Sequence, residues 1–595
     1  MTRISAAASL VVAIVVFSAP RPATAAECRV SGAVAGEVVV STSDDGFWRV
    51  KADVVSECAG VDCVRVRLDA SRDGAPQPFK VSFGAPLADA VGTWRTDLGF
   101  SKGLVQTWKK AARLSSSLAT DAPVASYYGT DSGNRLTVAC SESVRKVAIV
   151  TGIDEERRGL GFSAELFTEP EAPVRSYEVE FRVDRRGVFY ADAVRDAFGW
   201  CVARLGGEAD GGVPPGAFEP LYSTWYSYKQ GVSAASVERE CEAAAALGMK
   251  TVIVDDGWQT DGRGCGYSSC GDWRPSAAKF PDFKAHVAKV QSMGMKYMLW
   301  YSVPFVGEDS AAYERFKDKF LYRTWGAGVL DPRFPEVREH LAGIYVAALR
   351  DWGVDGMKLD FIDSFKFEDG KDPAVADGYA GRDLKSLPAA VDRLLGDIRA
   401  RLRAVRPDVL LEFRQSYVGP AMRRRGNMFR VFDCAYGAAQ NRVSSIDLRL
   451  SSGPAAVHSD MIIWPPDADG DGVSAQLLNA LFSVPQVSVR AGSLTAPQRE
   501  ALGRWMAFWR EHRDTLMRGE LRPMRPDLGY PVVYAFGKGE QVVAVYDEGQ
   551  AVSVDSARGT AYVVNATGAS SLTVCVDGAP RRMEVRPFGL LVVRP

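Results

Sequence analysis

Polar side chains that could do chemistry follow several short apolar runs in the second half of the chain. Asp255 and Asp256 follow one run, Lys358 and Asp360 lie at the end of another, and Asp433 follows a third. Cleavage of a glycosidic bond needs two carboxyl groups, one to attack the anomeric carbon and one to protonate the leaving oxygen. Asp360 and Asp433, which follow different runs, can supply these two groups.

Further charged and aromatic side chains follow the same runs. Carboxylates form strong, charge-assisted hydrogen bonds to sugar hydroxyls, and aromatic rings pack on the C–H faces of a pyranose. Each such residue also has a structural interpretation, because a lone Asp after a strand is often a helix N-cap or a turn residue. The predicted substrate-binding residues are Trp225, Asp255, Asp256, Trp258, Trp300, Lys358, Arg414, Gln415, Ser416 and Arg430.

The apolar runs alternate with amphipathic helices, which predicts parallel strands. Eight strands in this order favour a closed (β/α)₈ barrel, whose active site lies at the carboxyl ends of the strands. The last three strands are the least well marked, because the helical periodicity between them is weak. The expected strands span residues 221–225, 251–254, 297–300, 357–361, 409–413, 428–432, 455–458 and 484–489.

Short alternating segments on both sides of this region predict two flanking β-domains. We expect an N-terminal β-sandwich over residues 27–210, the barrel over 211–515 and a C-terminal antiparallel β-domain over 516–595. A Gly- and Pro-rich linker is expected at 206–215.

The first 26 residues predict a signal peptide. Arg3 precedes an apolar run, and Ala23-Thr24-Ala25 offers a cleavage site, which favours a secreted or periplasmic protein. An uncleaved anchor is the alternative, although the run is short for a membrane span. With 72 basic and 73 acidic residues the net charge is −1, which gives no basic field for nucleic acid.

We expect no metal and no organic cofactor. Two close cysteine pairs, Cys58 with Cys63 and Cys265 with Cys270, could form disulfides, but connectivity does not follow from spacing. Residues 467–471 match the first half of a calcium-binding loop, whose closing Glu is missing, so a solvated loop is favoured over calcium.

Four stretches together resemble glycoside hydrolase family 36, which includes α-galactosidases and raffinose synthases. They are VIVDDGWQ at 252–259, MLWYSVPF at 298–305, GMKLDF at 356–361 and LEFRQSYVGPAMRRRGNMFRVFDC at 411–434. The resemblance implies the same three domains. It also implies Asp360 as the nucleophile, Asp433 as the acid and base, Asp255, Asp256 and Lys358 as sugar ligands, and Trp300 as a wall of the pocket.

The resemblance implies a secreted, retaining exo-α-galactosidase acting on oligosaccharides or polysaccharides with terminal α-galactose, with nucleic acid excluded as a partner. The alternatives are an α-N-acetylgalactosaminidase, a galactosyl transferase, or a carbohydrate-binding protein without activity. Asp447 and Asp460 are alternative acids. We prefer Asp433, because it directly follows its strand, whereas Asp447 lies in an expected helix and should face away.

Overall fold

The computed structural model describes residues 26–43, 46–86, 89–206, 212–262, 266–414 and 416–595. The predicted signal peptide, Cys265 and Gln415 therefore lie outside the described residues. The chain forms two compact units, residues 1–97 with 102–207, and residues 98–101 with 208–595. The barrel and the C-terminal β-domain both belong to the second unit.

The first unit contains two six-stranded antiparallel sheets. The first sheet has the order β1 (Ala26–Gly32), β2 (Gly36–Thr42), β5 (Phe79–Pro86), β11 (Gly159–Leu166), β10 (Val147–Asp154) and β7 (Arg113–Ser116). The second has the order β3 (Trp48–Cys58), β4 (Val61–Ala70), β12 (Ser176–Asp184), β9 (Asn134–Cys140), β8 (Val124–Tyr128) and β6 (Gly92–Trp94). Helix α1 (Tyr190–Arg204) follows β12.

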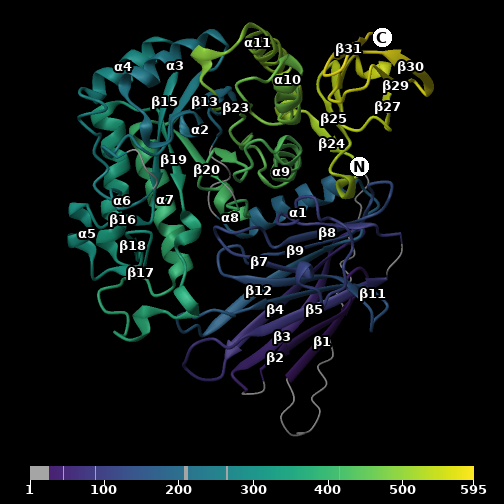
Figure 1. Cartoon of the computed structure of the whole chain (residues 1–595). Coiled ribbons are helices and arrows are strands. Elements are labelled where there is room, and N and C mark those ends of the chain that lie inside the picture. Colours follow the sequence, from purple (N-terminus) through teal and green to yellow (C-terminus); the bar gives the residue numbers. More distant parts are fainter. Residues whose placement is uncertain (1–25, 44–45, 87–88, 207–211, 263–265, 415) are drawn as a thin grey trace, which may run out of the picture. The chain divides into compact units, whose positions relative to one another are not determined.

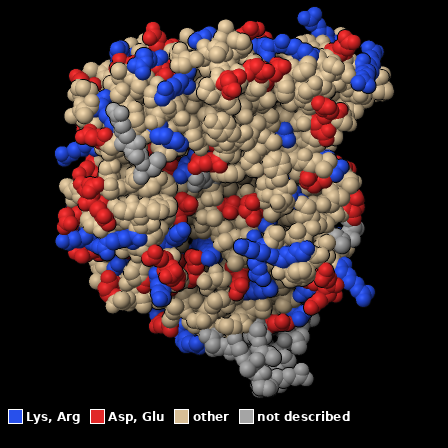
Figure 2. All heavy atoms as spheres, in the orientation of Figure 1, with Lys and Arg blue, Asp and Glu red and all other residues tan. Residues whose placement is uncertain are grey.

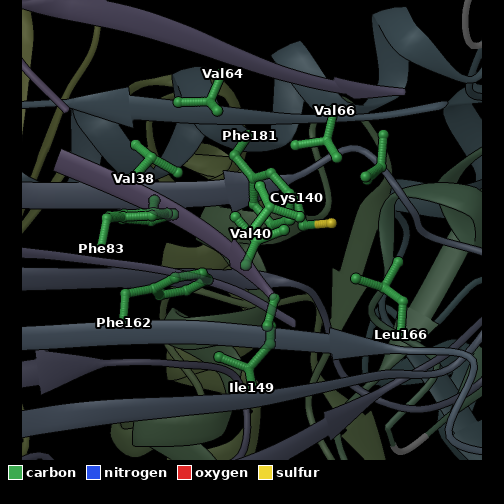
Figure 3. Packing of buried hydrophobic residues seen from close by; sticks show 14 of the residues in the cluster. Val38, Val40, Val64, Val66, Phe83, Cys140, Ile149, Phe162, Leu166 and Phe181 are labelled. Atoms are coloured by element: carbon green, nitrogen blue, oxygen red, sulfur yellow. The ribbon is translucent and has the colours of Figure 1, made fainter. Parts of the chain in front are cut away.

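Alternate residues of both sheets form the core of this unit. Val38 and Val40 of β2 and Val64 and Val66 of β4 are fully buried and belong to one cluster of apolar side chains (Figure 3). This period of two explains the alternating pattern of the sequence, because successive side chains of a strand point to opposite faces. The predicted sandwich is confirmed. Cys58 and Cys63 are both free thiols, so the candidate disulfide between them does not form.

All eight predicted barrel strands are present, and they follow one another around the barrel in chain order. Five of them, β13, β15, β19, β20 and β23, are labelled in Figure 1. They are β13 (Leu221–Ser223), β14 (Thr251–Val254), β15 (Lys296–Ser302), β19 (Gly356–Asp360), β20 (Leu410–Arg414), β21 (Met428–Arg430), β22 (Ala456–His458) and β23 (Gln486–Val487). Neighbouring strands are parallel, and β23 pairs with β13. Parallel bridges from His458 to Val484 and from Ile462 to Val487 close the ring.

Helices separate these strands. They are α3 (Ala234–Ala246), α4 (Phe283–Ser292), α6 (Pro335–Ala347), α7 (Leu387–Val405), α9 (Ala438–Ser451), α10 (Gly470–Asn479) and α11 (Ala496–Glu511). Between β20 and β21 there is just the four-residue α8 (Pro420–Arg423), which explains the weak helical signal there. Asp469 caps α10 by accepting a hydrogen bond from the Gly472 amide at 2.8 Å, which accounts for this part of the candidate calcium loop.

A three-stranded antiparallel sheet follows β15, in which β16 (Phe305–Gly307) and β17 (Phe320–Thr324) both pair with β18 (Ala327–Leu330). After α12 (Arg513–Arg518) the chain forms the C-terminal β-domain. One sheet contains β24 (Glu520–Pro523), β25 (Val532–Phe536), β26 (Glu540–Val545), β28 (Thr560–Asn565) and β31 (Leu590–Val593). The other contains β27 (Ala551–Val554), β29 (Ser571–Val576) and β30 (Ala579–Glu584). The β26–β28 and β27–β29 pairs run parallel, and the other pairs are antiparallel.

Charges of both signs are interspersed over the face of the molecule shown in Figure 2. Within the described residues, the helices are all too short or too polar to cross a membrane.

Candidate active site

The strand register brings the predicted site residues to one end of the barrel. Ser302 at the end of β15 is opposite Asp360 at the end of β19, and Arg414 of β20 is opposite Arg430 of β21. Because all these strands are parallel, their carboxyl ends form one mouth. Asp433 follows β21 by three residues and reaches the same mouth through its contacts with Arg414 and Arg430.

Asp360 is almost fully buried, at 3% exposure, and three donors hold its carboxylate. The indole Nε1 of Trp300 donates to Oδ2 at 2.8 Å, the backbone amide of Phe361 donates to Oδ1 at 2.7 Å, and Nε of Arg414 also donates to Oδ1. These three contacts fix the orientation of the Asp360 side chain at the mouth, as a nucleophile requires.

Arg414 and Arg430 connect three carboxylates into one ladder of charges. Besides Asp360, Arg414 contacts Oδ2 of Asp433 at 3.3 Å, and Arg430 donates to Oδ1 of Asp433 at 2.8 Å. Arg430 also contacts Asp460, which is fully buried. The side chain of Asp433 is 49% exposed, so it faces the mouth from which a substrate enters.

The charges around Asp433 determine its protonation. Burial raises the pKa of this carboxyl, but the charges of Arg430 and Arg414 outweigh burial and hold the pKa well below its ordinary value. In this structure Asp433 is thus an ion-paired carboxylate. A general acid has to carry a proton at the working pH, so the arginines oppose the acid role while they remain in contact.

The carboxylate pair after β14 forms a second polar wall. Lys358 donates to Oδ2 of Asp255 at 2.6 Å, and all three residues of this wall, Asp255, Asp256 and Lys358, are 3% exposed. Asp256 accepts from Gln230 at 2.8 Å and from Gln259 at 2.7 Å. Burial raises the pKa of Asp256 to about 6. The structure therefore brings this predicted set together as well.

The structure corrects the prediction for Trp258. It was predicted to contact substrate, but it is fully buried, and its ring packs against Trp273, Phe283, Tyr301 and Trp352. Phe283 belongs to α4, so Trp258 lies between the strands and the surrounding helices. Its indole donates to the backbone carbonyl of Trp300 at 2.9 Å, and we assign it a packing role.

Two other predicted residues lie near the mouth without a contact to the catalytic pair in the described part of the chain. Trp225 begins the short α2 (Trp225–Tyr228) instead of ending β13, and the Lys229 ammonium lies 4.4 Å from its ring centroid. Ser416 is half-buried in the loop after β20, where its carbonyl accepts from the Val418 amide.

The two alternative acids are poorly placed. Asp460 is fully buried, contacts Arg430 and accepts from the Cys434 amide at 2.6 Å. Asp447 lies on α9 and accepts from the Tyr530 hydroxyl of the C-terminal β-domain, which is away from the barrel mouth as predicted. These positions favour Asp433 as the acid.

Glu412 is a further buried acidic residue of the barrel, which is not among the predicted site residues. It lies in the middle of β20, fully buried, and accepts a hydrogen bond from Gln486 of β23. Burial raises its pKa to about 7, against the opposing charges of Lys358 and Arg430. The signal was present in the sequence, because an acidic residue interrupts an otherwise apolar central strand.

Residues 221–361 match the melibiase family, and this segment contains β13 to β19 and ends just after Asp360. The match thus covers the first four strands of the barrel. This match confirms the resemblance to glycoside hydrolase family 36 that the sequence motifs indicated. It covers the predicted nucleophile but not Asp433.

Curated relatives match short segments of the chain. A bifunctional α-galactosidase and sucrose kinase of Mediterraneibacter gnavus is 31% identical over 179 residues, which is 28% of this chain and 17% of the relative. A probable α-galactosidase of Aspergillus flavus is 27% identical over 159 residues, 24% of this chain and 21% of the relative. The chain thus spans about a fifth of the length of the curated relatives it matches.

Solved structures extend the likeness to nearly the whole chain. A family 36 α-galactosidase of Geobacillus stearothermophilus has a TM-score of 0.62 at 15% identity, covering 95% of this chain and 82% of that structure. At this identity the likeness establishes the fold alone, a (β/α)₈ barrel with flanking β-domains.

Proposed function

We propose that this chain is a secreted, retaining exo-α-galactosidase that removes terminal α-galactose from oligosaccharides or polysaccharides. Asp360 attacks the anomeric carbon while Asp433 protonates the leaving oxygen, and a covalent galactosyl–enzyme forms. Asp433 then takes a proton from a water molecule, whose oxygen displaces Asp360 and releases α-galactose. No metal or organic cofactor takes part in these steps.

One observation carries the proposal: Arg414 contacts both Asp360 and Asp433. The two carboxylates therefore lie on either side of a single guanidinium group at the barrel mouth. In a retaining glycosidase the two carboxyl groups flank the scissile bond about 5–5.5 Å apart. Contact with one guanidinium group keeps the two carboxylates close enough to act on one glycosidic bond, as a double displacement requires.

The acid role needs a proton on Asp433, which the two arginines disfavour in the free protein. A sugar that enters between Asp360 and Asp433 takes the place of Arg414 beside at least one of them. Loss of this cation and of solvent from Asp433 both raise the pKa of its carboxyl. Substrate binding therefore prepares the acid, and removal of the substrate restores the ion pair.

The first experiment is turnover of an α-galactoside followed by proton NMR, in which α-galactose should appear before its β-anomer. Asp360→Ala should abolish turnover and keep the fold, and azide should partly restore turnover of an activated substrate by replacing the nucleophile. A β-anomer as first product, or near-normal activity of Asp360→Ala, contradicts the proposal.

A second experiment tests the acid. Asp433→Ala should slow cleavage of raffinose far more than formation of the glycosyl–enzyme from a dinitrophenyl galactoside, because a good leaving group needs little protonation. Asp460→Ala is the comparison. If Asp460→Ala shows this dependence on the leaving group and Asp433→Ala does not, the proton comes from Asp460.

Secretion rests on residues 1–26, with their apolar run and Ala23-Thr24-Ala25 site. Expression of the full chain should give a mature protein outside the cytoplasm that begins near Ala26. An N-terminus that still carries Arg3 on exported protein favours an uncleaved anchor instead.

A further inference from the structure

An exposed tryptophan lies at the tip of the β17–β18 hairpin. Thr324 pairs with Ala327, so the turn contains two residues, Trp325 and Gly326, with φ values of 52° and 72°. Both residues are thus left-handed, as in a type I′ turn, which favours Asn and Gly. A bulky side chain in this region is an outlier. Trp325 is also 63% exposed, so neither its backbone conformation nor its burial explains its presence.

A continuous series of rings leads from Trp325 to the predicted nucleophile. The centroid of Trp325 lies 5.8 Å from that of Tyr267, and Tyr267 stacks on Trp300 at 6.4 Å. Trp300 donates to Asp360, so its ring borders the place where the reacting sugar sits. Tyr267 lies one ring further out, and Trp325 is the outermost ring.

The platform of Trp325 and Tyr267 is fixed in place. Phe305 contacts the Trp325 ring edge-on at 5.9 Å, and Phe361 contacts the same ring at 6.2 Å. The backbone carbonyl of Gly326 accepts from the Glu308 amide at 3.0 Å, which holds the turn against the preceding loop. A ring that is already ordered before binding loses little entropy when it contacts a ligand.

We propose that the platform of Trp325 and Tyr267 binds the first sugar ring of the leaving group, so that these two residues determine the preference for a sugar over a small leaving group. This inference rests on the proposed function. A ring stacked on Trp325 lies beyond the reacting sugar, which Trp300 and Asp360 contact. The platform is aromatic, and a pyranose offers it an apolar C–H face while its hydroxyl groups remain in water. The backbone strain at Trp325 is retained because the exposed ring has this function.

The test compares two substrates with Trp325→Asn. Asn suits the left-handed turn position, so the variant should unfold at the same or a higher temperature than wild type. The leaving group of raffinose is a sugar, whereas that of α-galactosyl fluoride is a fluoride ion. For raffinose kcat/KM should fall about tenfold, mainly through KM, because the platform binds ground state and transition state alike. For the fluoride, kcat/KM of the variant should change less than about twofold, which is within the scatter of neutral surface substitutions.

Two further variants serve as controls. Trp325→Phe keeps an aromatic ring and should recover most of the raffinose activity. Trp108→Asn removes a tryptophan of similar exposure, 64%, from the first unit. This variant should leave kcat/KM unchanged for both substrates. An equal loss on both substrates, or an unchanged kcat/KM for raffinose in Trp325→Asn, overturns the platform. If wild type turns over neither substrate, the proposed function fails instead.

Discussion

Glu412→Gln tests the charge balance inside the barrel. Glu412 is fully buried, and its Oε2 accepts from Gln486, while Oε1 has no hydrogen-bond partner among the described residues. His458 beside them is neutral, because burial lowers its pKa to about 4, and its Nε2 faces the Ala217 carbonyl at 2.8 Å. Burial raises the pKa of Glu412 from 4.5 to about 7.

The sign and size of the effect follow from this shift. A carboxyl whose pKa is raised by folding stabilises the folded state below its unfolded pKa, and this contribution is lost as the pH rises through the folded pKa. Each pKa unit corresponds to 1.36 kcal/mol, so the shift of Glu412 is equivalent to about 3 kcal/mol. Between pH 4 and pH 8 the free energy of unfolding of wild type should therefore fall by about 3 kcal/mol more than that of Glu412→Gln.

The measurement is urea denaturation of both proteins at a series of pH values, followed as the difference in free energy of unfolding. If Gln makes other contacts than Glu, the difference in free energy of unfolding changes by the same amount at every pH. The other carboxyl groups, such as Asp256, are present in both proteins, so their contributions cancel in the difference. The difference should rise between about pH 4.5 and pH 7 and be flat outside that range. Parallel stability curves for the two proteins would refute the assignment of a raised pKa to Glu412.

Three further predictions concern the site and its surroundings. Arg414→Gln should move the alkaline limb of the pH profile of kcat/KM to higher pH, because the charge of Arg414 lowers the pKa of Asp433; an unchanged alkaline limb would argue against this effect on the acid. Tyr530→Phe removes a hydrogen bond to Asp447, so it should cost about 1 kcal/mol in thermal or urea unfolding and leave kcat unchanged. EDTA should leave activity unchanged, since two carboxyl groups suffice for the chemistry; loss of activity restored by calcium would identify residues 467–471 as a metal site.

The sequence predicted the barrel well because its periodicity is strong where strands and helices pack on one another. Runs such as 251–254 and 297–300 are buried on both faces, and the helices between them have one apolar face. The crossover from β20 to β21 was difficult to read, because α8 has four residues and shows no helical period. The position of Asp360 followed directly from the end of its strand, which every parallel barrel places at the mouth.

Side-chain partners were beyond the reach of the sequence. Trp258 immediately follows the acidic pair of β14, and nothing in the motif shows that its ring turns outward among Trp273 and the helices. The contacts of Arg414 with both carboxylates likewise depend on the spacing of β19, β20 and the residues after β21. That spacing depends on strand register, which a single sequence does not contain.

Several residues around the mouth of the barrel have left-handed backbone conformations, as do others elsewhere in the chain. Trp325 and Phe361 both have positive φ, and both rings contact Tyr267. Tyr436 has positive φ as well, lies three residues after Asp433 and is 62% exposed. Each of these conformations destabilises the fold relative to a Gly or Asn at the same position. Such strained residues are kept where the side chain has another function. Phe361 shows the purpose most directly, because its strained backbone aims its amide at the Asp360 carboxylate. The strain at the mouth thus accompanies the orientation of the nucleophile.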